Sequence, residues 1–364
     1  MKIALLHDFL TQLGGAERVL CEFHKIFPSA AVYTLFHDPI KTLHRFDGWD
    51  VRTSFLQKFP HKINYKWYLP LLPLAVRSLD LSEYDLVLSD TSALIKGIKL
   101  SPKTTHICYC HTPTRYLWQE RKNYVDNLPY PALVKAGVQP VLSLLKKWDY
   151  AAAQKVNYFI ANSQEVRGRI KKFYQRDSEV IYPPVDTNFF TPSTATTREP
   201  FYLAAGRIEP YKRFDIAIDA CQMLNIPLKI AGTGSIMQKL RKTASKNVEF
   251  LGLVSDDELR SLYRGAKAFL FPAKEDAGIM ILESLACGTP AICFREGGAM
   301  EFVREGTDGE FFDFQDARSL AKALVRFQET KYDPDSLVNR ARQFRQEIFR
   351  ENILNFINTH ANRI

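Results

Sequence analysis

The 364-residue sequence has no uninterrupted apolar run of the roughly 18 residues that a membrane-spanning helix needs. Its first residues, MKIALLHDFL, hold a short apolar run that soon reaches His7 and Asp8, which favours a buried strand over a signal peptide. Low-complexity tracts and short-period repeats are also missing. These absences argue against membrane-spanning, disordered and repeat proteins, and they favour an ordinary globular chain.

Cysteine is scarce as well. Six cysteines in a chain of this length do not make a disulfide framework. Cys108 and Cys110 lie in the apolar run THICYCH, where a reduced core strand is favoured over a metal site. We therefore expect a reducing, cytoplasmic location.

Acidic residues are under-represented in one half of the chain. Residues 1–184 contain 25 Lys and Arg against 16 Asp and Glu, whereas the remaining residues contain 24 of each, so the whole excess of +9 lies in the first half. Such a field attracts nucleic acid, anionic lipid or a phosphorylated substrate. No nucleic-acid-binding motif accompanies the charge, so we expect no nucleic acid partner.

Short apolar runs alternate with helical patterns along both halves. Continuous apolar strands separated by helices indicate parallel sheets that are covered on both faces. Two sets of such strands predict an α/β chain with two Rossmann-like domains. The expected strands are residues 2–7, 31–36, 85–89, 105–110 and 157–161, then 201–205, 227–231, 248–251, 267–271 and 290–294.

The boundary between the domains is expected in IYPPVDTNFFTP, residues 181–192, because two adjacent prolines cannot continue a helix. The expected domains are residues 1–183 and 184–344. Residues 336–358 have helical apolar spacing, and we expect a C-terminal helix of about residues 345–364 to pack back on the first domain.

Glycines follow several of the expected strands. Gly206 ends the run FYLAAG, the segment GTGS contains Gly232 and Gly234, and Gly14 and Gly15 precede a helical pattern. Glycine lets backbone amides approach phosphate at a helix start, but a tight turn explains each segment equally well. None of them matches the full dinucleotide fingerprint or the Walker A loop.

Cationic side chains also gather at an expected strand end. In AAGRIEPYKRFD, Arg207 ends a strand and Lys212 follows after a proline-containing turn, so the two cations are suited to clamp a diphosphate. Solvated surface charge is the simpler alternative. His111 follows another expected strand, where a site role and a structural role are equally reasonable on sequence grounds.

The segment EDAGIMILE holds two glutamates, Glu275 and Glu283, eight residues apart. On one helix this spacing leaves roughly 80° between them, so they would not share a tight face. If the helix begins near Ala277, Glu275 lies in the preceding loop. Two solvated glutamates remain the alternative for this segment in isolation.

Four stretches together resemble the retaining glycosyltransferases of the GT-B fold, family-four or group 1 type. They are LGGAERV, the HTP turn, GRIEPYKRFD, and Glu275-x7-Glu283 followed by ACGTPAI. The resemblance runs over nearly the whole chain, and HDFLTQLGGAERVL and VIYPPVD are most similar to bacterial mannosyl- and glucosyltransferases of envelope polysaccharide synthesis. It implies an acceptor domain and a nucleotide-sugar donor domain that face each other across a cleft.

The resemblance also implies roles for single residues. Arg207 and Lys212 match cations that bind the donor diphosphate, Glu275 matches a residue that holds donor sugar hydroxyls, and Glu283 matches one that accepts from the ribose. The remaining matches are the backbone of Ala277, Gly278 and Ile279 under the donor, Gly14 and Gly15 near its phosphates, His111 near the reacting sugar, and residues 250–255 near the base.

On this resemblance the reaction retains configuration through front-face departure and attack, without a metal or another cofactor. The only Asp-x-Asp segment, residues 333–335, is interpreted as a turn. The donor is a GDP- or UDP-linked mannose or glucose, and the acceptor is a saccharide, expected to be lipid-linked. A nucleotide-sugar epimerase and a non-catalytic nucleotide-sugar sensor are the alternatives; a glycosidase would not need the diphosphate cations.

Residues 51–79 contain five basic residues and no acid, with large aromatic residues among them. This composition suits an anionic membrane surface, so we expect a peripheral contact with the inner face of the plasma membrane. Internal packing beneath a loop of the first domain is an equal alternative. The residues concerned are Arg52, Lys58, Lys62, Lys66 and Arg77, with Phe55, Phe59, Tyr65, Trp67 and Tyr68.

Overall fold

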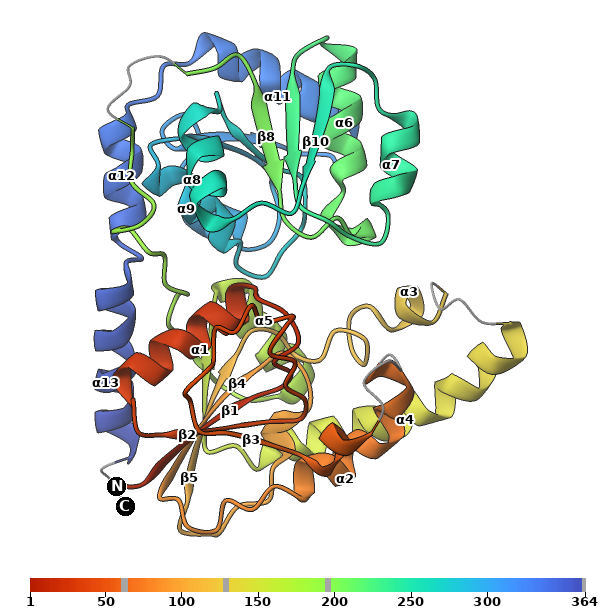
Figure 1. The fold of residues 1–364 in the computed structure, drawn as a ribbon, viewed down its shortest axis with the longest axis vertical. Helices are drawn as coiled ribbons and strands as arrows, with labels where there is room; N and C mark the ends of the chain where they lie inside the picture. Colours follow the sequence, from red (N-terminus) through yellow and green to blue (C-terminus); the bar gives the residue numbers. More distant parts are fainter. Residues whose placement is uncertain (60–64, 127–130, 194–197, 362–364) are drawn as a thin grey trace. The chain divides into compact units, whose positions relative to one another are not determined.

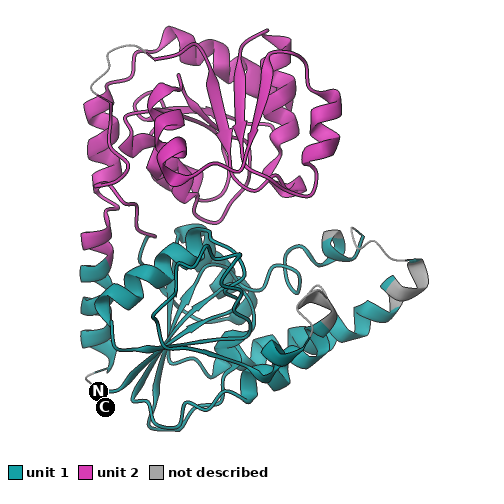
Figure 2. Cartoon of the chain, in the orientation of Figure 1, with its two compact units in different colours: residues 1–182, 350–364 teal, residues 183–349 magenta. Residues whose placement is uncertain are grey.

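The computed structural model describes residues 1–59, 65–126, 131–193 and 198–361. They form two compact units (Figure 2): unit 1 is Met1–Tyr182 with Arg350–Ile364, and unit 2 is Pro183–Phe349. Within these ranges no helix has both the length and the apolar character needed to cross a bilayer.

Unit 1 contains a seven-stranded sheet in which every strand is parallel to its neighbours, in the order β3-β2-β1-β4-β5-β6-β7 (Figure 1). The strand order reverses between β1 and β4, and ligands bind at such switch points in open α/β sheets. The strands are β1 (Ile3–His7), β2 (Ala31–Thr34), β3 (Val51–Thr53), β4 (Leu86–Thr91), β5 (Thr105–Cys110), β6 (Tyr158–Ala161) and β7 (Glu179–Val180).

Helices cover both faces of this sheet, which is why its inner strands are buried and largely apolar. On one face α2 and α4 pack on side chains of β1, β2 and β4, and on the other the Phe23 ring of α1 lies 5.6 Å from the Tyr109 ring of β5. The helical elements are α1 (Gly15–Ile26), η1 (Phe55–Lys58), η2 (Tyr65–Leu71), α2 (Leu72–Arg77), η3 (Ile95–Gly97), α3 (Arg121–Asp126), α4 (Ala132–Gln154), α5 (Gln164–Tyr174) and α13 (Gln346–Ala361).

Unit 2 contains a six-stranded parallel sheet in the order β10-β9-β8-β11-β12-β13, with its switch point between β8 and β11. Its strands are β8 (Tyr202–Ala205), β9 (Leu228–Ala231), β10 (Val248–Gly252), β11 (Phe269–Phe271), β12 (Ala291–Phe294) and β13 (Gly309–Phe312). Its helical elements are η4 (Pro210–Lys212), α6 (Phe214–Met223), α7 (Met237–Thr243), α8 (Asp256–Gly265), α9 (Ile279–Ala286), α10 (Ala299–Phe302), α11 (Ala317–Glu329) and α12 (Pro334–Arg342).

The ten strands expected from the sequence are confirmed, with ends that shift by one or two residues. Three further strands, β3, β7 and β13, were not predicted. Each lies at the edge of its sheet, where fewer neighbours require an apolar run. Polar residues such as Arg52, Glu179 and Glu310 therefore occupy these strands and hide them from a search for apolar segments.

The helical pattern over residues 336–358 is interrupted, contrary to expectation. The structure has two helices, α12 and α13, because the backbone between them pairs with the interdomain segment. The Val185 amide donates to the Phe344 carbonyl at 2.9 Å, and Val185 and Arg345 form a parallel bridge. The Phe344 carbonyl therefore accepts a hydrogen bond from outside the helices.

The last helix, α13, starts in unit 2 and ends in unit 1. In unit 1 the Arg350 guanidinium pairs with the buried Glu22 carboxylate of α1, and the Phe356 ring lies 6.3 Å from the Tyr158 ring of β6. Unit 2 consequently ends at Phe349, later than the expected residue 344. One continuous helix gives no local signal at the point where the chain changes units.

Candidate functional site

Three polar side chains meet at the switch point of unit 1. His7 ends β1 and is the register partner of Asp90 on β4. The His7 Nδ1 lies 2.8 Å from Asp90 Oδ2, and the other oxygen of Asp90, Oδ1, is hydrogen-bonded to Nε2 of His111, which directly follows β5. Asp90 is fully buried, whereas the His111 side chain is 13% exposed. His111 is thus the member of the group that a ligand reaches most easily.

A fourth polar group, Glu17, comes from the first turn of α1. Its Oε1 lies 3.5 Å from His7 Nε2, and its Oε2 has no hydrogen-bond partner among the described residues. A Cβ added at Gly14 would lie 3.1 Å from that Oε2. A carboxylate therefore occupies the helix start to which the resemblance assigned donor phosphates, and its charge opposes a phosphate next to Gly14 and Gly15.

These buried groups fix one another's charge. Burial alone would lower the pKa of His7, but hydrogen bonds to Asp90 and Glu17 raise it to about 10. Burial alone would raise the pKa of both carboxyls, but His111 and His7 hold the pKa of Asp90 below its usual value, and His7 does the same for Glu17. His7 is therefore an imidazolium between two carboxylates at neutral pH.

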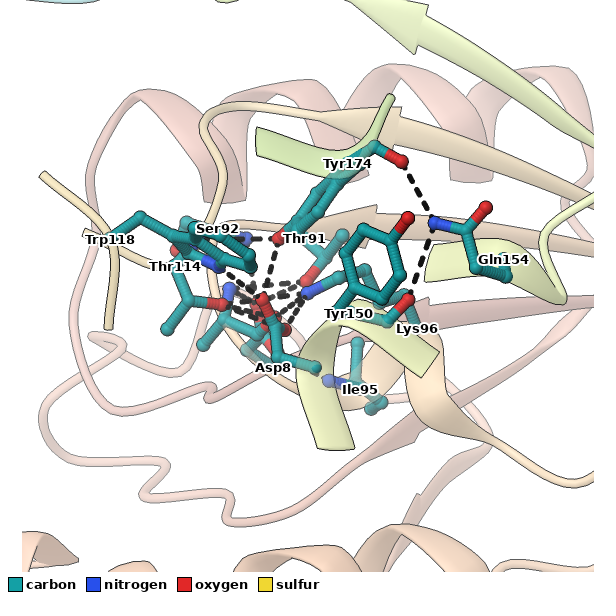
Figure 3. A network of polar contacts seen from close by, with 12 residues as sticks. Asp8, Thr91, Ser92, Ile95, Lys96, Thr114, Trp118, Tyr150, Gln154 and Tyr174 are labelled. Carbon is teal, nitrogen blue, oxygen red and sulfur yellow. Dashed lines mark hydrogen bonds and ion pairs between the residues drawn. The ribbon is translucent and has the colours of Figure 1, made fainter. Parts of the chain in front are cut away.

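The neighbouring Asp8 organises the backbone at the same end of the sheet (Figure 3). Its Oδ2 accepts from the Thr91 hydroxyl and from the amides of Ser92 and Ala93 at 2.7–2.8 Å, and its Oδ1 accepts from the Ile95 amide at 2.9 Å. Four donors around one carboxylate tie the end of β1 to the turn after β4. The Asp8 carboxylate therefore has a structural role.

A second buried network holds the loop that follows His111 (Figure 3). The Asp149 carboxylate of α4 pairs with the Lys96 ammonium and accepts from the side chains of Thr114, Trp118 and Tyr174. These contacts join η3, the loop, α4 and α5. The loop that follows His111 is thus anchored to η3, α4 and α5.

In unit 2 the expected cationic turn lies at the switch point. Gly206 follows β8, η4 contains Lys212, and the Lys212 ammonium is ion-paired with the carboxylate of Glu275, which follows β11. Both side chains are mostly buried, with 13% and 17% exposed. The Arg207 guanidinium donates to the Tyr211 hydroxyl at 3.2 Å. The structure therefore brings Lys212 and Glu275 together, with Gly206 beside them.

The glycines of the GTGS segment are explained by backbone packing. A Cβ at Gly232 would lie 1.9 Å from the Gly206 carbonyl oxygen, and one at Gly234 would lie 2.2 Å from that of Ile208. The Ser235 amide and hydroxyl also donate to Glu209, at 3.3 Å and 2.5 Å. The segment thus packs tightly on the turn after β8, which favours the tight-turn interpretation over a phosphate loop.

A pair of glycines that the sequence interpretation overlooked supports the Glu275 loop. The Gly298 amide donates to the Glu275 carbonyl at 2.9 Å. A Cβ at Gly297 would lie 2.3 Å from the same carbonyl oxygen, and one at Gly298 would lie 2.6 Å from the Ala277 Cα. The backbone of Gly297 and Gly298 therefore packs directly on the loop that carries Glu275 and holds that loop in place.

The loop ends at α9, whose first residue is Ile279. The preceding Gly278 has φ +84°, a conformation that glycine adopts without strain, and Ala277 is buried. Glu283 lies on the same helix, 2% exposed, and its Oε2 accepts from the Tyr263 hydroxyl of α8 at 3.2 Å. The two glutamates thus occupy different environments: one is paired with a lysine and the other is held by a tyrosine.

The Asp-x-Asp segment, residues 333–335, does not form the turn that was expected. The Asp333 carboxylate accepts from the amides of Asp335 and Ser336, both at 3.2 Å, and so caps the N-terminus of α12. The interpretation as a turn is therefore wrong. The segment begins a helix, in which Pro334 takes the first position.

The residues overlooked by the sequence interpretation are mostly neighbours of residues that it named. His7 ends β1, Asp90 is the last residue but one of β4, and Glu17 stands two residues after the Gly14-Gly15 pair. The available signal was a polar residue at the carboxyl end of each of two expected strands. Gly298 and Tyr263 gave no such signal, because their roles come from contacts that are distant in sequence.

Two family models match the chain. "Glycosyltransferase Family 4" matches residues 13–189, and "Glycosyl transferases group 1" matches residues 185–344. Together they cover most of both units.

Curated relatives match part of the chain. It is 28% identical over 204 residues to a D-inositol 3-phosphate glycosyltransferase of Streptomyces scabiei, covering 47% of this chain and 46% of the relative. It is 30% identical over 174 residues to a GDP-mannose-dependent alpha-(1-6)-phosphatidylinositol monomannoside mannosyltransferase of Mycolicibacterium smegmatis, covering 40% and 46%. The chain thus spans about half the length of these relatives.

Solved structures match nearly the whole chain. Anabaena HepE in complex with UDP superposes with a TM-score of 0.72 at 18% identity, over 99% of this chain and 100% of that one. Sucrose-phosphate synthase from Thermosynechococcus elongatus gives 0.73 at 15% identity, over 99% of both. At these identities the likeness shows the fold, which is GT-B. With both family models matching in sequence, the chain belongs to the group 1 glycosyltransferases.

Proposed function

We propose that this protein transfers a hexose, mannose or glucose, from a GDP- or UDP-linked donor to a saccharide acceptor in envelope polysaccharide synthesis. The observation that carries the proposal is the Lys212–Glu275 pair at the switch point of unit 2, within the segment matched by the group 1 model. The name of the mannosyltransferase relative supports a GDP-mannose donor, and a HepE structure in complex with UDP-glucose supports a UDP-glucose donor.

The donor contacts follow from charge and position. The Lys212 ammonium, with Arg207, would offset the charge that develops on the departing nucleoside diphosphate. Glu275 would accept from sugar hydroxyls, and the amides of Ala277, Gly278 and Ile279 would lie under the same sugar and phosphates. The buried Glu283 would accept from ribose hydroxyls. No metal or further cofactor is proposed.

The environment of Glu275 supports retention by front-face attack. A carboxylate that is ion-paired with lysine is a poorer nucleophile than an unpaired one, which disfavours a covalent glycosyl-enzyme intermediate. The leaving phosphate would instead take the proton of the incoming hydroxyl as the new bond forms. His111 of unit 1 would hydrogen-bond a hydroxyl near the reacting carbon.

The acceptor is proposed to carry an anionic group, as a lipid-linked diphosphate does. Unit 1 has a surface pocket of about 370 Å³ lined by Arg121 and Lys122 with Trp118, Gln119 and Gln139, and none of these described residues is acidic. Arg121 donates to Gln139 and Ser143, which orders its guanidinium. Two cations beside an aromatic ring favour a phosphate attached to an apolar chain.

Membrane contact is proposed for part of residues 51–79. Phe55, Phe59 and Leu74 are 38%, 42% and 58% exposed, and Lys58 is exposed beside them. Leu56, Leu69, Leu72, Ala75 and Val76 are instead buried in the core. Arg52 is held by Asp50 and the Tyr33 hydroxyl. Lys62 lies outside the described residues, and so do the side chains of residues 65–67.

The protein would then act in the cytoplasm, at the inner face of the plasma membrane. That location would give it both a cytoplasmic nucleotide sugar and a lipid-linked acceptor. The exposed aromatic residues would insert into the bilayer interface, and anionic headgroups would attract the basic surface of unit 1.

The test combines a thermal-shift screen of nucleotide sugars with a transfer assay on lipid-linked acceptors. A true donor should raise the melting temperature by mass action. Lys212→Ala and Glu275→Ala should each reduce transfer by roughly a hundredfold or more. Glu283→Ala should raise the donor KM more than it lowers kcat. The control is Lys239→Ala, an exposed lysine of α7.

Full transfer by Lys212→Ala would overturn the diphosphate assignment. Conversion of the donor sugar without an acceptor would indicate an epimerase. Donor binding without turnover on any acceptor would indicate a sensor. Either result would contradict the proposed transfer.

A further inference from the structure

Asp90 is a carboxylate that lies outside the proposed donor site and is held between two histidines. It is fully buried at the switch point of unit 1, and each of its two oxygens meets a different imidazole. His7 comes from the neighbouring strand β1, whereas His111 follows the neighbour on the other side, β5. One carboxylate thus links three adjacent strands at the carboxyl edge of the sheet.

The location of the protons follows from the charges. The pKa of Asp90 lies below its usual value, so its carboxylate is ionised and accepts from both rings. The proton between Asp90 and His111 consequently belongs to Nε2 of His111. A ring that carries its one proton on Nε2 has a lone pair on Nδ1.

We propose that Asp90 is a positioning residue for His111: it fixes the Nε2–H tautomer and leaves Nδ1 to accept a hydrogen bond from a substrate hydroxyl. The proposal rests on the proposed glycosyl transfer for the identity of that hydroxyl, a sugar hydroxyl of donor or acceptor. A ring held this way cannot donate from Nδ1 unless it gains a second proton.

His7 explains why Asp90 keeps its charge. A lone buried carboxylate would tend to take a proton and would then compete with His111 as a donor. His7, protonated on both nitrogens, donates Nδ1–H to Asp90 and faces Glu17 with Nε2–H. The group thus contains one imidazolium between two carboxylates, and Asp90 remains an acceptor.

The other groups near His111 do not compete for this role. The Tyr109 ring lies 5.3 Å from the His111 ring, and the Tyr109 hydroxyl donates to the Ile181 carbonyl at 3.0 Å. Burial raises the pKa of Tyr109 well above its usual value, so the tyrosine stays neutral. Among the described residues, the carboxylate that holds the His111 ring is therefore that of Asp90.

The chain offers a matched control on the same two strands. Ser89 of β4 and His106 of β5 are buried and lie 2.8 Å apart, Oγ to Nε2. Burial lowers the pKa of His106 to about 3, so this imidazole is neutral, and its hydrogen bond is to Ser89 and not to Asp90. Replacing His106 disturbs the same sheet without touching Asp90.

The experiment measures ¹⁵N NMR spectra of the histidine rings in the full chain, together with transfer kinetics. In the wild type we expect the Nε2–H tautomer for His111 and protons on both nitrogens of His7 at pH 8. Asp90→Asn keeps the size of the side chain but removes its charge. It should disturb the His111 tautomer and lower kcat at least roughly tenfold, with the donor KM changed less than threefold.

His106→Gln should leave both the His111 tautomer and kcat within twofold of the wild type. His7→Gln is a second test, since it keeps a hydrogen-bonding side chain but removes the charge; it should lower kcat in the same direction as Asp90→Asn. Donor-induced thermal shifts, which depend on unit 2, should persist in all three variants and so report that the chain is folded.

An Nδ1–H tautomer of His111 in the wild type would overturn the proposal, and so would an unchanged kcat in Asp90→Asn. In the second case an active wild type would leave the proposed function standing. A wild type that transfers no sugar but shows the Nε2–H tautomer would contradict the proposed function while confirming the arrangement of the ring. The NMR measurement decides the tautomer without any turnover.

Discussion

At the scale of single residues, Glu275 shows how the environment assigns a role to a carboxylate. The sequence places two glutamates eight residues apart, and the segment in isolation leaves two solvated side chains as an alternative to a ligand site. In the fold, Lys212 pairs with Glu275, and Tyr263 donates to Glu283. Their different partners, which the spacing does not reveal, separate the two side chains chemically.

Gly298→Ala tests the support beneath Glu275. Gly298 has φ −63°, which alanine adopts freely, so the change is purely steric. The new Cβ would meet the Ala277 Cα and the Asp276 carbonyl oxygen at 2.6 Å and should displace the loop. We expect the donor KM to rise at least roughly tenfold, since misplacement by about an ångström costs up to a hundredfold. Steady-state kinetics measures this.

The control for this change is Gly168→Ala in α5. A Cβ there meets nothing within 4 Å, and alanine favours a helix by roughly 0.5–1 kcal/mol. The control should be equally active and slightly more stable. A donor KM that is unchanged in Gly298→Ala would contradict the supporting role of this glycine.

At the scale of elements, apolar runs were a good guide to the inner strands and a poor one to the edges. A strand that is covered on both faces must be largely apolar, and nine of the ten expected strands lie inside their sheets; the tenth, β10, is an edge strand that is partly exposed. The three missed strands have a neighbour on one side alone and tolerate Arg52 or Glu179. Helix α13 shows a related limit. Its helical spacing is regular, so the sequence does not reveal that its first residues belong to unit 2 and the rest to unit 1.

The part of α13 that belongs to unit 1 gives a prediction on stability. Ile353 is fully buried, so Ile353→Ala should lower the free energy of unfolding of unit 1 by about 2–5 kcal/mol. The adjacent Leu354 is 40% exposed, and Leu354→Ala should cost less than about 1 kcal/mol. All four tryptophans lie in residues 1–182, so tryptophan fluorescence during urea unfolding reports on unit 1. Equal losses in the two variants would show that α13 does not stabilise unit 1.

At the scale of the whole molecule, the charge is divided between the units. The net positive charge of the first half coincides with the unit that bears Lys58 and the exposed Phe55 and Phe59. We expect the protein to sediment with anionic vesicles at low salt and to be released as salt screens the attraction. Binding should be weak on neutral vesicles.

Lys58→Glu changes the charge by two units and should weaken binding to anionic vesicles by roughly thirtyfold, because about 1 kcal/mol is associated with each charge near such a surface. Lys239→Glu makes the same change of charge in unit 2 and should have a smaller effect. Equal losses would show that net charge, and not this surface, governs the binding. No sedimentation at low salt would exclude the membrane contact.

The sequence by itself determined the two parallel sheets, the strands of their interiors and the segments that follow those strands. It could do so because burial on two faces leaves a local pattern of apolar runs. It also named Lys212 and His111 from their places after expected strands, and Glu275 from the paired glutamates and the family resemblance. The tertiary structure decided the partners: Asp90 between His7 and His111, Lys212 on Glu275, and Gly298 beneath Ala277. Such contacts join residues that are far apart in the chain, so no local pattern encodes them.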